Sequence, residues 1–178
     1  MRCWRWWEVT GYLIPTLIEV EEHSLAEQYA EFLSHMQRPN GAFAGPDKRE
    51  YVFDTAQALR GLLRASQHWD RFRPFALKAA DYIASSVKKN GRIPSIYEEE
   101  AAEYVHVFIL PVLVEAAHVF NKPEYLEIAN KSLIYYKNVP DILDDNPLTH
   151  FLAYTIDGFI EMGEADFVRL LIKKIFSS

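Results

Sequence analysis

Apolar residues recur along this chain with the 3.6-residue period of an α-helix, and no segment shows the alternation that is typical of a β-strand. In the clearest example, which begins near Asp54, the residues Leu59, Leu62 and Leu63 fall on one stripe. We expect Asp54 and Thr55 to cap this helix, because their side-chain oxygens can accept the free N–H groups of a first turn. The whole pattern predicts an all-α chain of four helical hairpins, over residues 9–37, 54–88, 104–137 and 148–176.

The first helix of each hairpin is the more apolar, so we expect it to be buried beneath an amphipathic second helix. The stretch from Tyr104 to Phe120 is apolar almost all round and predicts a single buried helix. Pro15 is expected early in its helix, where a missing N–H costs least.

Two alignments indicate an internal repeat of these hairpins. Residues 10–19 match residues 106–115, with Pro15 over Pro111, and residues 52–61 match residues 149–158, with Gly61 over Gly158. Chance similarity between apolar helices is the alternative. A repeat is typical of hairpin arrays, in which each hairpin buries its inner face only against its neighbours. The alignments therefore predict parallel inner helices within an outer layer.

Length and charge restrict the class of protein. With 178 residues the chain suits one substantial core, so we expect a single domain over residues 1–178. Its net charge of −6, without a basic stripe, argues against a nucleic-acid partner. The single Cys3 allows no internal disulfide, and no residues show the spacing of a metal site. No apolar run is long enough to span a membrane, and no signal peptide is recognisable, so we expect a cytoplasmic protein without a membrane partner or a cofactor.

Parallel inner helices would collect their N-termini at one end, where free N–H groups favour anions and where polar and aromatic residues gather. The carboxylates of Glu8 and Asp54 could act there as acid and base on a sugar, although Asp54 could equally be a simple cap. His106 and His150 could each serve as a general base, although a structural histidine is the commoner case. The residues expected to bind the substrate are Thr10, Tyr12, Phe43, Phe53, Gln57, Tyr97, Tyr104, Thr149 and Tyr154.

Four stretches carry a resemblance to a known family: residues 8–17 (EVTGYLIPTL), residues 40–43 (NGAF), residues 52–57 (VFDTAQ) with GLL at 61–63, and residues 147–154 (PLTHFLAY). They resemble α/α-toroid proteins that are encoded with bacterial and archaeal polysaccharide genes. Those proteins belong with the six-hairpin glycosidase-like and terpenoid-cyclase-like toroids, and the C-terminal helical domain of glucuronyl C5-epimerases is a similar structure. The resemblance spans nearly the whole chain. It implies an α/α toroid with a glycan-binding centre, and it assigns no catalytic residue.

The chain also departs from that family. A complete toroid has about six hairpins, whereas the pattern predicts four, so an open arc, a remnant, or half of a homodimer that completes the toroid are the alternatives. The aspartate motif of cyclising terpene synthases is absent, as are the zinc ligands of lanthionine cyclases and protein prenyltransferases.

We therefore expect a carbohydrate-active protein that binds an acidic or neutral oligosaccharide or polysaccharide. As an enzyme it would be a hydrolase, a lyase or an epimerase, with His106 or His150 as the base and Glu8 or Asp54 as the acid. One alternative is a non-catalytic helical-repeat scaffold that binds a protein or a second copy of itself. Another is a terpenoid-cyclase-like protein that binds an apolar ligand.

Overall fold

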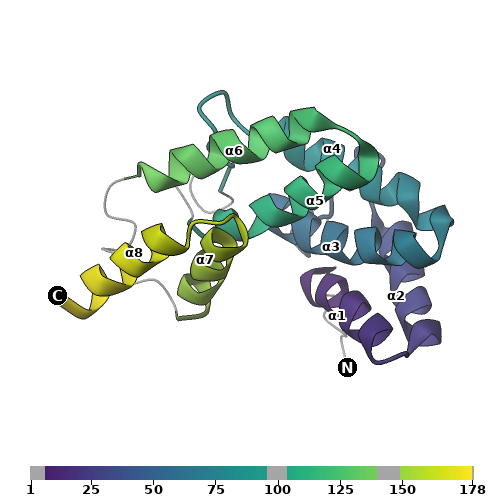
Figure 1. The fold of residues 1–178 in the computed structure, drawn as a ribbon. Helices are drawn as coiled ribbons and strands as arrows, with labels where there is room; N and C mark the ends of the chain where they lie inside the picture. Colours follow the sequence, from purple (N-terminus) through teal and green to yellow (C-terminus); the bar gives the residue numbers. More distant parts are fainter. Residues whose placement is uncertain (1–6, 96–103, 140–148, 178) are drawn as a thin grey trace. The chain divides into compact units, whose positions relative to one another are not determined.

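A computed structural model describes residues 7–95, 104–139 and 149–177, and within these residues it contains helices and no strand (Figure 1). A single isolated bridge joins Ala44 to Glu50. The described part of the chain is therefore all-α, as the periodicity predicts. The elements in order are α1 (Trp7–Glu19), α2 (His23–Met36), α3 (Val52–His68), the 3₁₀ helix η1 (Asp70–Phe72), α4 (Arg73–Ser86), the 3₁₀ helix η2 (Tyr104–Ile109), α5 (Leu110–Phe120), α6 (Pro123–Lys137), α7 (Thr149–Glu161) and α8 (Ala165–Ser177).

The described chain divides into two compact units, and the prediction of one domain stays a prediction. Unit 1 comprises residues 1–86 with residues 118–121, and unit 2 comprises residues 87–117 with residues 122–178. None of the described helices is both long enough and apolar enough to cross a membrane.

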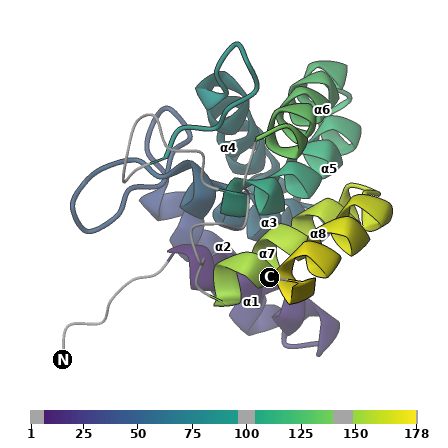
Figure 2. The ribbon, with the colours of Figure 1, turned by 90° about the vertical axis from the view of Figure 1, so that its left-hand side faces the viewer.

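Helix α3 forms the centre of unit 1. It packs against α1, α2 and α4, and ten of its seventeen residues are buried. Figure 2 shows α3 and its neighbours turned by 90° from the view of Figure 1. Its neighbours are amphipathic, with three buried residues in α2 and four in α4. The first helix of the second hairpin is therefore the buried one, as its apolar pattern predicts.

In unit 2 the helix α7 packs against η2 and α8, and α6 also contacts η2. Tyr125, Tyr136 and Phe159 are its largest fully buried side chains. The hydroxyl of Tyr136 accepts a hydrogen bond of 3.2 Å from the backbone N–H of Ile93, which fixes the chain that follows α4 onto α6.

The capping prediction for α3 was wrong. The helix begins at Val52, so Asp54 is the third residue of its first turn, and no side chain caps this helix. The hydroxyl of Thr55 donates to the carbonyl of Tyr51 at 2.7 Å and accepts from the N–H of Phe43 at 3.0 Å. The N–H of Tyr51 also donates to the carbonyl of Phe43. These bonds to the preceding loop, rather than a cap, determine where the helix starts.

The single helix predicted from Tyr104 to Phe120 is instead the 3₁₀ helix η2 followed by α5. Pro111 explains the break, because proline has no N–H to donate and is best tolerated at the start of an α-helix. The α-helix accordingly begins at Leu110, immediately before Pro111. Pro15 behaves differently from the prediction, because it lies inside α1 rather than near its start.

The aligned prolines and glycines mark the same backbone contact in both units. In an ordinary α-helix the residues at Pro15 and Pro111 would donate to the carbonyls of the residues four positions earlier, Gly11 and Val107, and proline cannot. A Cβ added at Gly61 would lie 2.8 Å from the Gly11 oxygen, and one added at Gly158 would lie 2.6 Å from the carbonyl carbon of Val107. Gly61 therefore lets α3 approach the backbone of α1, and Gly158 lets α7 approach the backbone of η2, at the carbonyl groups to which Pro15 and Pro111 cannot donate.

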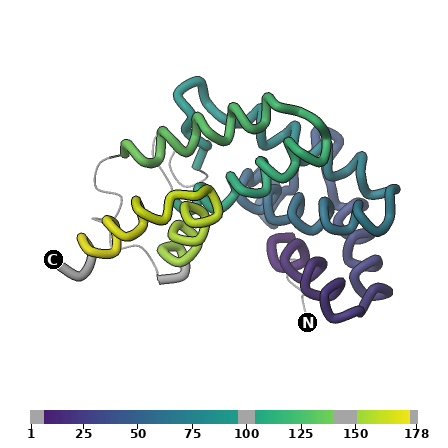
Figure 3. The backbone as a smooth tube through the Cα atoms, in the orientation of Figure 1, coloured from purple at the N-terminus to yellow at the C-terminus, as the bar shows by residue number. Residues whose placement is uncertain are grey.

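The turns after α2 and α4 are also alike in the conformation of one glycine each, and Figure 3 traces the backbone of the chain that contains them. Gly41 and Gly91 have φ values of 93° and 94°, a left-handed conformation that favours glycine. A Cβ at Gly41 would lie 2.1 Å from the oxygen of Lys78 in α4, and one at Gly91 would lie 2.5 Å from the oxygen of Lys131 in α6. Each turn therefore abuts the next outer helix along the chain.

Candidate functional site

Two carboxylates lie at the same end of the parallel helices α1 and α3. Glu8 is in the first turn of α1, and Asp54 is in the first turn of α3. One turn further along, a Cβ at Gly11 would lie only 2.1 Å from the backbone oxygen of Gln57, and a Cβ at Gly61 would lie 3.0 Å from the side chain of Ile14. These contacts advance together along both helices, which confirms their predicted parallel direction within unit 1.

The environment of Asp54 changes its acidity. Burial, which disfavours the charged form, and to a smaller extent the nearby Glu8 carboxylate together raise the pKa of the Asp54 carboxyl group to about 6. Two acids whose surroundings separate their protonation states are the usual arrangement for proton transfer near neutral pH. The pair can therefore offer a proton from Asp54 beside a second carboxyl group.

Gln57 lies one helical turn beyond Asp54 and is completely buried. Within the described residues, neither its side-chain nitrogen nor its side-chain oxygen has a hydrogen-bond partner. Leaving such an amide unpaired costs about 1–3 kcal/mol. The backbone oxygen of Gln57 is also the atom against which Gly11 of α1 packs, so the unpaired amide belongs to the contact between α1 and α3.

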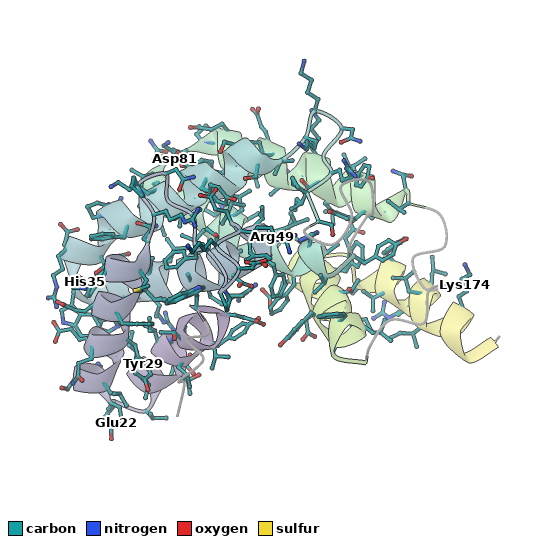
Figure 4. The ribbon with its side chains drawn as sticks, turned by 180° about the vertical axis from the view of Figure 1, so that it is seen from behind. Glu22, Tyr29, His35, Arg49, Asp81 and Lys174 are labelled. Atoms are coloured by element: carbon teal, nitrogen blue, oxygen red, sulfur yellow. The ribbon has the colours of Figure 1, made fainter. Side chains whose placement is uncertain are left out.

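The loop before α3 places three further polar groups at this end of unit 1. The Tyr51 hydroxyl and the Arg49 guanidinium both donate to the Asp47 carboxylate. These bonds raise the pKa of Tyr51 to about 12 and lower the pKa of Asp47 to about 2, with the Tyr51 hydrogen bond the largest cause in both cases. Figure 4 shows Arg49 on this loop. The sequence pattern does not predict this cluster, because Asp47 and Arg49 are residue types that are ordinary in a solvated loop.

Trp7 holds that loop against α1. Its indole N–H donates to the carbonyl of Ala44 at 2.7 Å, and its ring stacks on Phe32 with centroids 5.5 Å apart. Phe43 is fully buried beside it, with ring centroids 6.4 Å apart. Because Phe43 presents no exposed face, we place it among the residues that support the site. Thr10, Tyr12 and Phe53 are half-buried in the same unit.

The remaining residues predicted for the site belong to unit 2 or lie outside the described part. His106 is buried in η2, and Tyr104 is half-buried. Tyr154 stacks on Phe108 with centroids 4.8 Å apart and an angle of 20° between the rings. Tyr97 lies outside the described residues, and so do the side chains of Thr149 and His150. The structure thus brings together Glu8, Asp54 and Gln57, while a pocket shared with unit 2 stays a prediction.

An open hollow of about 470 Å³ lies elsewhere in unit 2, and none of the predicted site residues lines it. The hollow follows the turn after α4 and the outer face of α6, and its lining residues are Asn90, Lys131, Ile134, Tyr135, Asn138 and Val139.

Among the residues that the structure describes, no group of three or more His, Cys, Asp or Glu side chains could hold a metal ion.

Comparison of the chain with protein-family models, with curated proteins and with solved structures finds no match. The α/α-toroid resemblance therefore rests on residues 8–17, 40–43, 52–63 and 147–154 alone. Any proposal of a reaction rests on the arrangement of Glu8 and Asp54 in unit 1.

Proposed function

We propose that the chain is an α/α-toroid protein that binds a glycan at the N-terminal end of its inner helices and hydrolyses a glycosidic bond there. The observation that supports this most is the pairing of Glu8 with Asp54, whose pKa is raised to about 6. Glycoside hydrolysis needs a carboxylic acid that is still protonated near neutral pH and a second carboxylate close to it. The family resemblance adds support by analogy alone.

In this proposal Asp54 donates its proton to the leaving glycosidic oxygen. Glu8 then takes a proton from the attacking water, or stabilises the positive charge that develops on the sugar ring. Gln57, like Phe43, has no exposed surface, so in this proposal it supports the turn that carries Asp54 and does not contact the sugar.

The test is a reducing-sugar assay over a panel of α- and β-linked oligosaccharides, measured from pH 4 to pH 8. We expect activity that falls as the pH rises through about 6, because Asp54 loses its proton there. Asp54→Asn should lower kcat by about 100-fold or more, since general acid catalysis contributes about 10²–10⁴. The matched control is Asp70→Asn, at an exposed aspartate in η1, which should leave the rate unchanged. Equal losses in both variants would contradict the role of Asp54.

A second candidate function is self-association of a helical scaffold. Nine large apolar side chains are exposed among the described residues, and eight of them lie on the α1–α2 and α7–α8 hairpins. Exposed apolar side chains that gather on two hairpins favour a contact with another protein surface. The eight residues are Val9, Leu13, Val20, Leu25, Phe151, Ile160, Leu170 and Ile172.

Light scattering during gel filtration tests this second function. If these exposed apolar side chains bind a second copy of the chain, Leu170→Glu should convert an oligomer to a monomer. Ile134→Glu is the matched control, because Ile134 is 62% exposed on α6 and Leu170 is 65% exposed on α8. A monomeric parent chain would refute the scaffold.

A further inference from the structure

Two turns of this chain present the same reactive pair of residues to water. Asparagine precedes glycine twice in the sequence, at Asn40 and at Asn90, and both asparagine side chains are exposed. Glycine has no side chain to shield its backbone nitrogen, so this nitrogen can reach the side-chain carbonyl carbon of the asparagine before it. Each turn is therefore a candidate for spontaneous loss of ammonia from asparagine.

The backbone bonds of the two turns are the same. In each turn the glycine N–H donates to the carbonyl oxygen three residues earlier at 2.9 Å. The asparagine Oδ1 accepts from the N–H two residues later, at 3.2 Å for Asn40 and at 3.1 Å for Asn90. The glycine φ values, 93° and 94°, also agree. The backbone therefore resists the reaction to a similar extent in both turns, and a difference in rate must come from the side chains.

The two asparagines differ at the amide nitrogen. The Nδ2 atom of Asn40 donates to both oxygens of the Glu50 carboxylate, at 3.2 Å and 3.1 Å. Arg38 donates to the same carboxylate at 2.9 Å and holds it in place. Within the part of the chain that the structure describes, the Nδ2 atom of Asn90 has no hydrogen-bond partner. Hydrogen bonds to a carboxylate are stronger than neutral ones, so Glu50 restrains the amide that would have to turn and depart.

We propose that Asn90 is a site of spontaneous deamidation and isomerisation, and that Glu50 protects Asn40 from the same reaction. In the first step the Gly91 nitrogen bonds to Cγ of Asn90, the bond from Cγ to Nδ2 breaks, and the departing ammonia takes the proton of the Gly91 nitrogen. Water then opens the five-membered imide. Cleavage between the nitrogen and Cγ gives aspartate, and cleavage between the nitrogen and the backbone carbonyl carbon gives isoaspartate, whose main chain runs through Cγ. This inference is independent of the proposed function.

Isoaspartate at position 90 would change how the turn meets α6. Gly91 packs so closely that a Cβ on it would lie 2.5 Å from the backbone oxygen of Lys131. One additional main-chain carbon before Gly91 displaces the glycine from that oxygen. Asn90 and Lys131 also line the hollow on α6, so the reaction changes both the shape and the charge of its lining. We therefore expect the isoaspartyl form to be less stable than the fresh chain.

The experiment incubates the full chain at pH 8 over several weeks. Peptide mapping by mass spectrometry follows each asparagine, and labelling by an isoaspartyl methyltransferase measures isoaspartate. We expect Asn90 to react about tenfold faster than Asn40, because the bonds from Asn40 to a carboxylate must break first. Glu50→Ala should raise the rate at Asn40 to that at Asn90 and leave Asn90 unchanged. Equal rates in the parent chain, a faster Asn40, or no reaction at either asparagine would overturn the proposal.

Two further variants separate the chemistry from a loss of structure. Arg38→Ala removes the ion pair to Glu50 and retains the groups that bond Asn40 to Glu50, so Asn40 should stay slow. Equal acceleration of Asn40 by Arg38→Ala and by Glu50→Ala would overturn the protective role of Glu50. Asn90→Asp introduces the charge without the additional main-chain carbon, so its Tm should fall less than that of the isoaspartyl form. An equal fall in Tm would overturn the expected effect on the contact with α6.

Discussion

Units 1 and 2 each contain the same kind of close backbone contact, and they differ in the side chains that surround it. In each unit a glycine packs against the residue that lies four positions before a proline: Gly61 against Gly11 in unit 1, and Gly158 against Val107 in unit 2. The positions of Glu8, Asp54 and Gln57 in unit 1 correspond in the aligned repeat to Tyr104, Phe151 and Tyr154 in unit 2. Unit 1 therefore has acids and an amide where unit 2 has aromatic rings, one of which stacks on Phe108.

This difference shows that the backbone contact and the side chains near it have separate sequence requirements. The close approach needs only glycine and proline, because it is made between backbones. The side chains one turn away are free to differ, so one unit can carry acid–base groups while the other carries aromatic surface of the kind that contacts sugar rings and apolar ligands. Variants can test whether the backbone contact contributes to stability in both units, and whether the side chains that differ act independently of it.

The largest expected effect is on the shared contact. A Cβ at Gly61 would lie 2.8 Å from the backbone oxygen of Gly11, and one at Gly158 would lie 2.6 Å from the carbonyl carbon of Val107. Gly61→Val and Gly158→Val should each lower the free energy of unfolding by about 3 kcal/mol or more, measured by urea denaturation. Gly163→Ala is the control, because it meets open space at a φ of 84° and should cost about 1 kcal/mol. A loss in one unit only would break the equivalence.

A smaller effect concerns the acid that unit 2 lacks. The folded pKa of Asp54 lies near 6, above the value of about 3.9 in an unfolded chain. The folded state therefore binds more protons between these values, and stability falls as the pH rises through that window. Asp54→Asn should raise the free energy of unfolding at pH 7 by about 1–2 kcal/mol and flatten its pH dependence. A variant with an unchanged slope from pH 4 to pH 7 would contradict this account.

The smallest expected effect is at Gln57. Gln57→Leu replaces an unpaired buried amide by an apolar group of similar size, and it should stabilise the ligand-free chain by about 1 kcal/mol. Thermal unfolding of the two chains measures this change. Destabilisation by Gln57→Leu would show that the amide is paired in the folded chain.

The sequence predicts the helices and the hairpins well, because apolar periodicity is a local signal. The alignment of Pro15 with Pro111 and of Gly61 with Gly158 is visible in the sequence, but the backbone contact at these residues is not. The start of α3 and the 3₁₀ helix η2 are missed, since a distant hydrogen bond from Tyr51 to Phe43 determines the first and the position of Pro111 determines the second.

The candidate site is predictable only in part. Parallel inner helices correctly place Glu8 and Asp54 at one end. The raised pKa of Asp54 and the complete burial of Gln57 depend on how closely α1 packs against α3, which periodicity does not measure. The bonds among Asp47, Arg49 and Tyr51 depend on the path of an irregular loop, for which the sequence pattern has no signal.

The two Asn-Gly turns have a consequence for how such a chain can change in length. Gly41 and Gly91 lie 50 residues apart, and each sets the distance between the end of one outer helix and the backbone of the next. A contact between a glycine and a backbone carbonyl does not depend on the side chains of either helix. We therefore expect that a hairpin of about that length can be inserted or deleted at such a turn without loss of the contact.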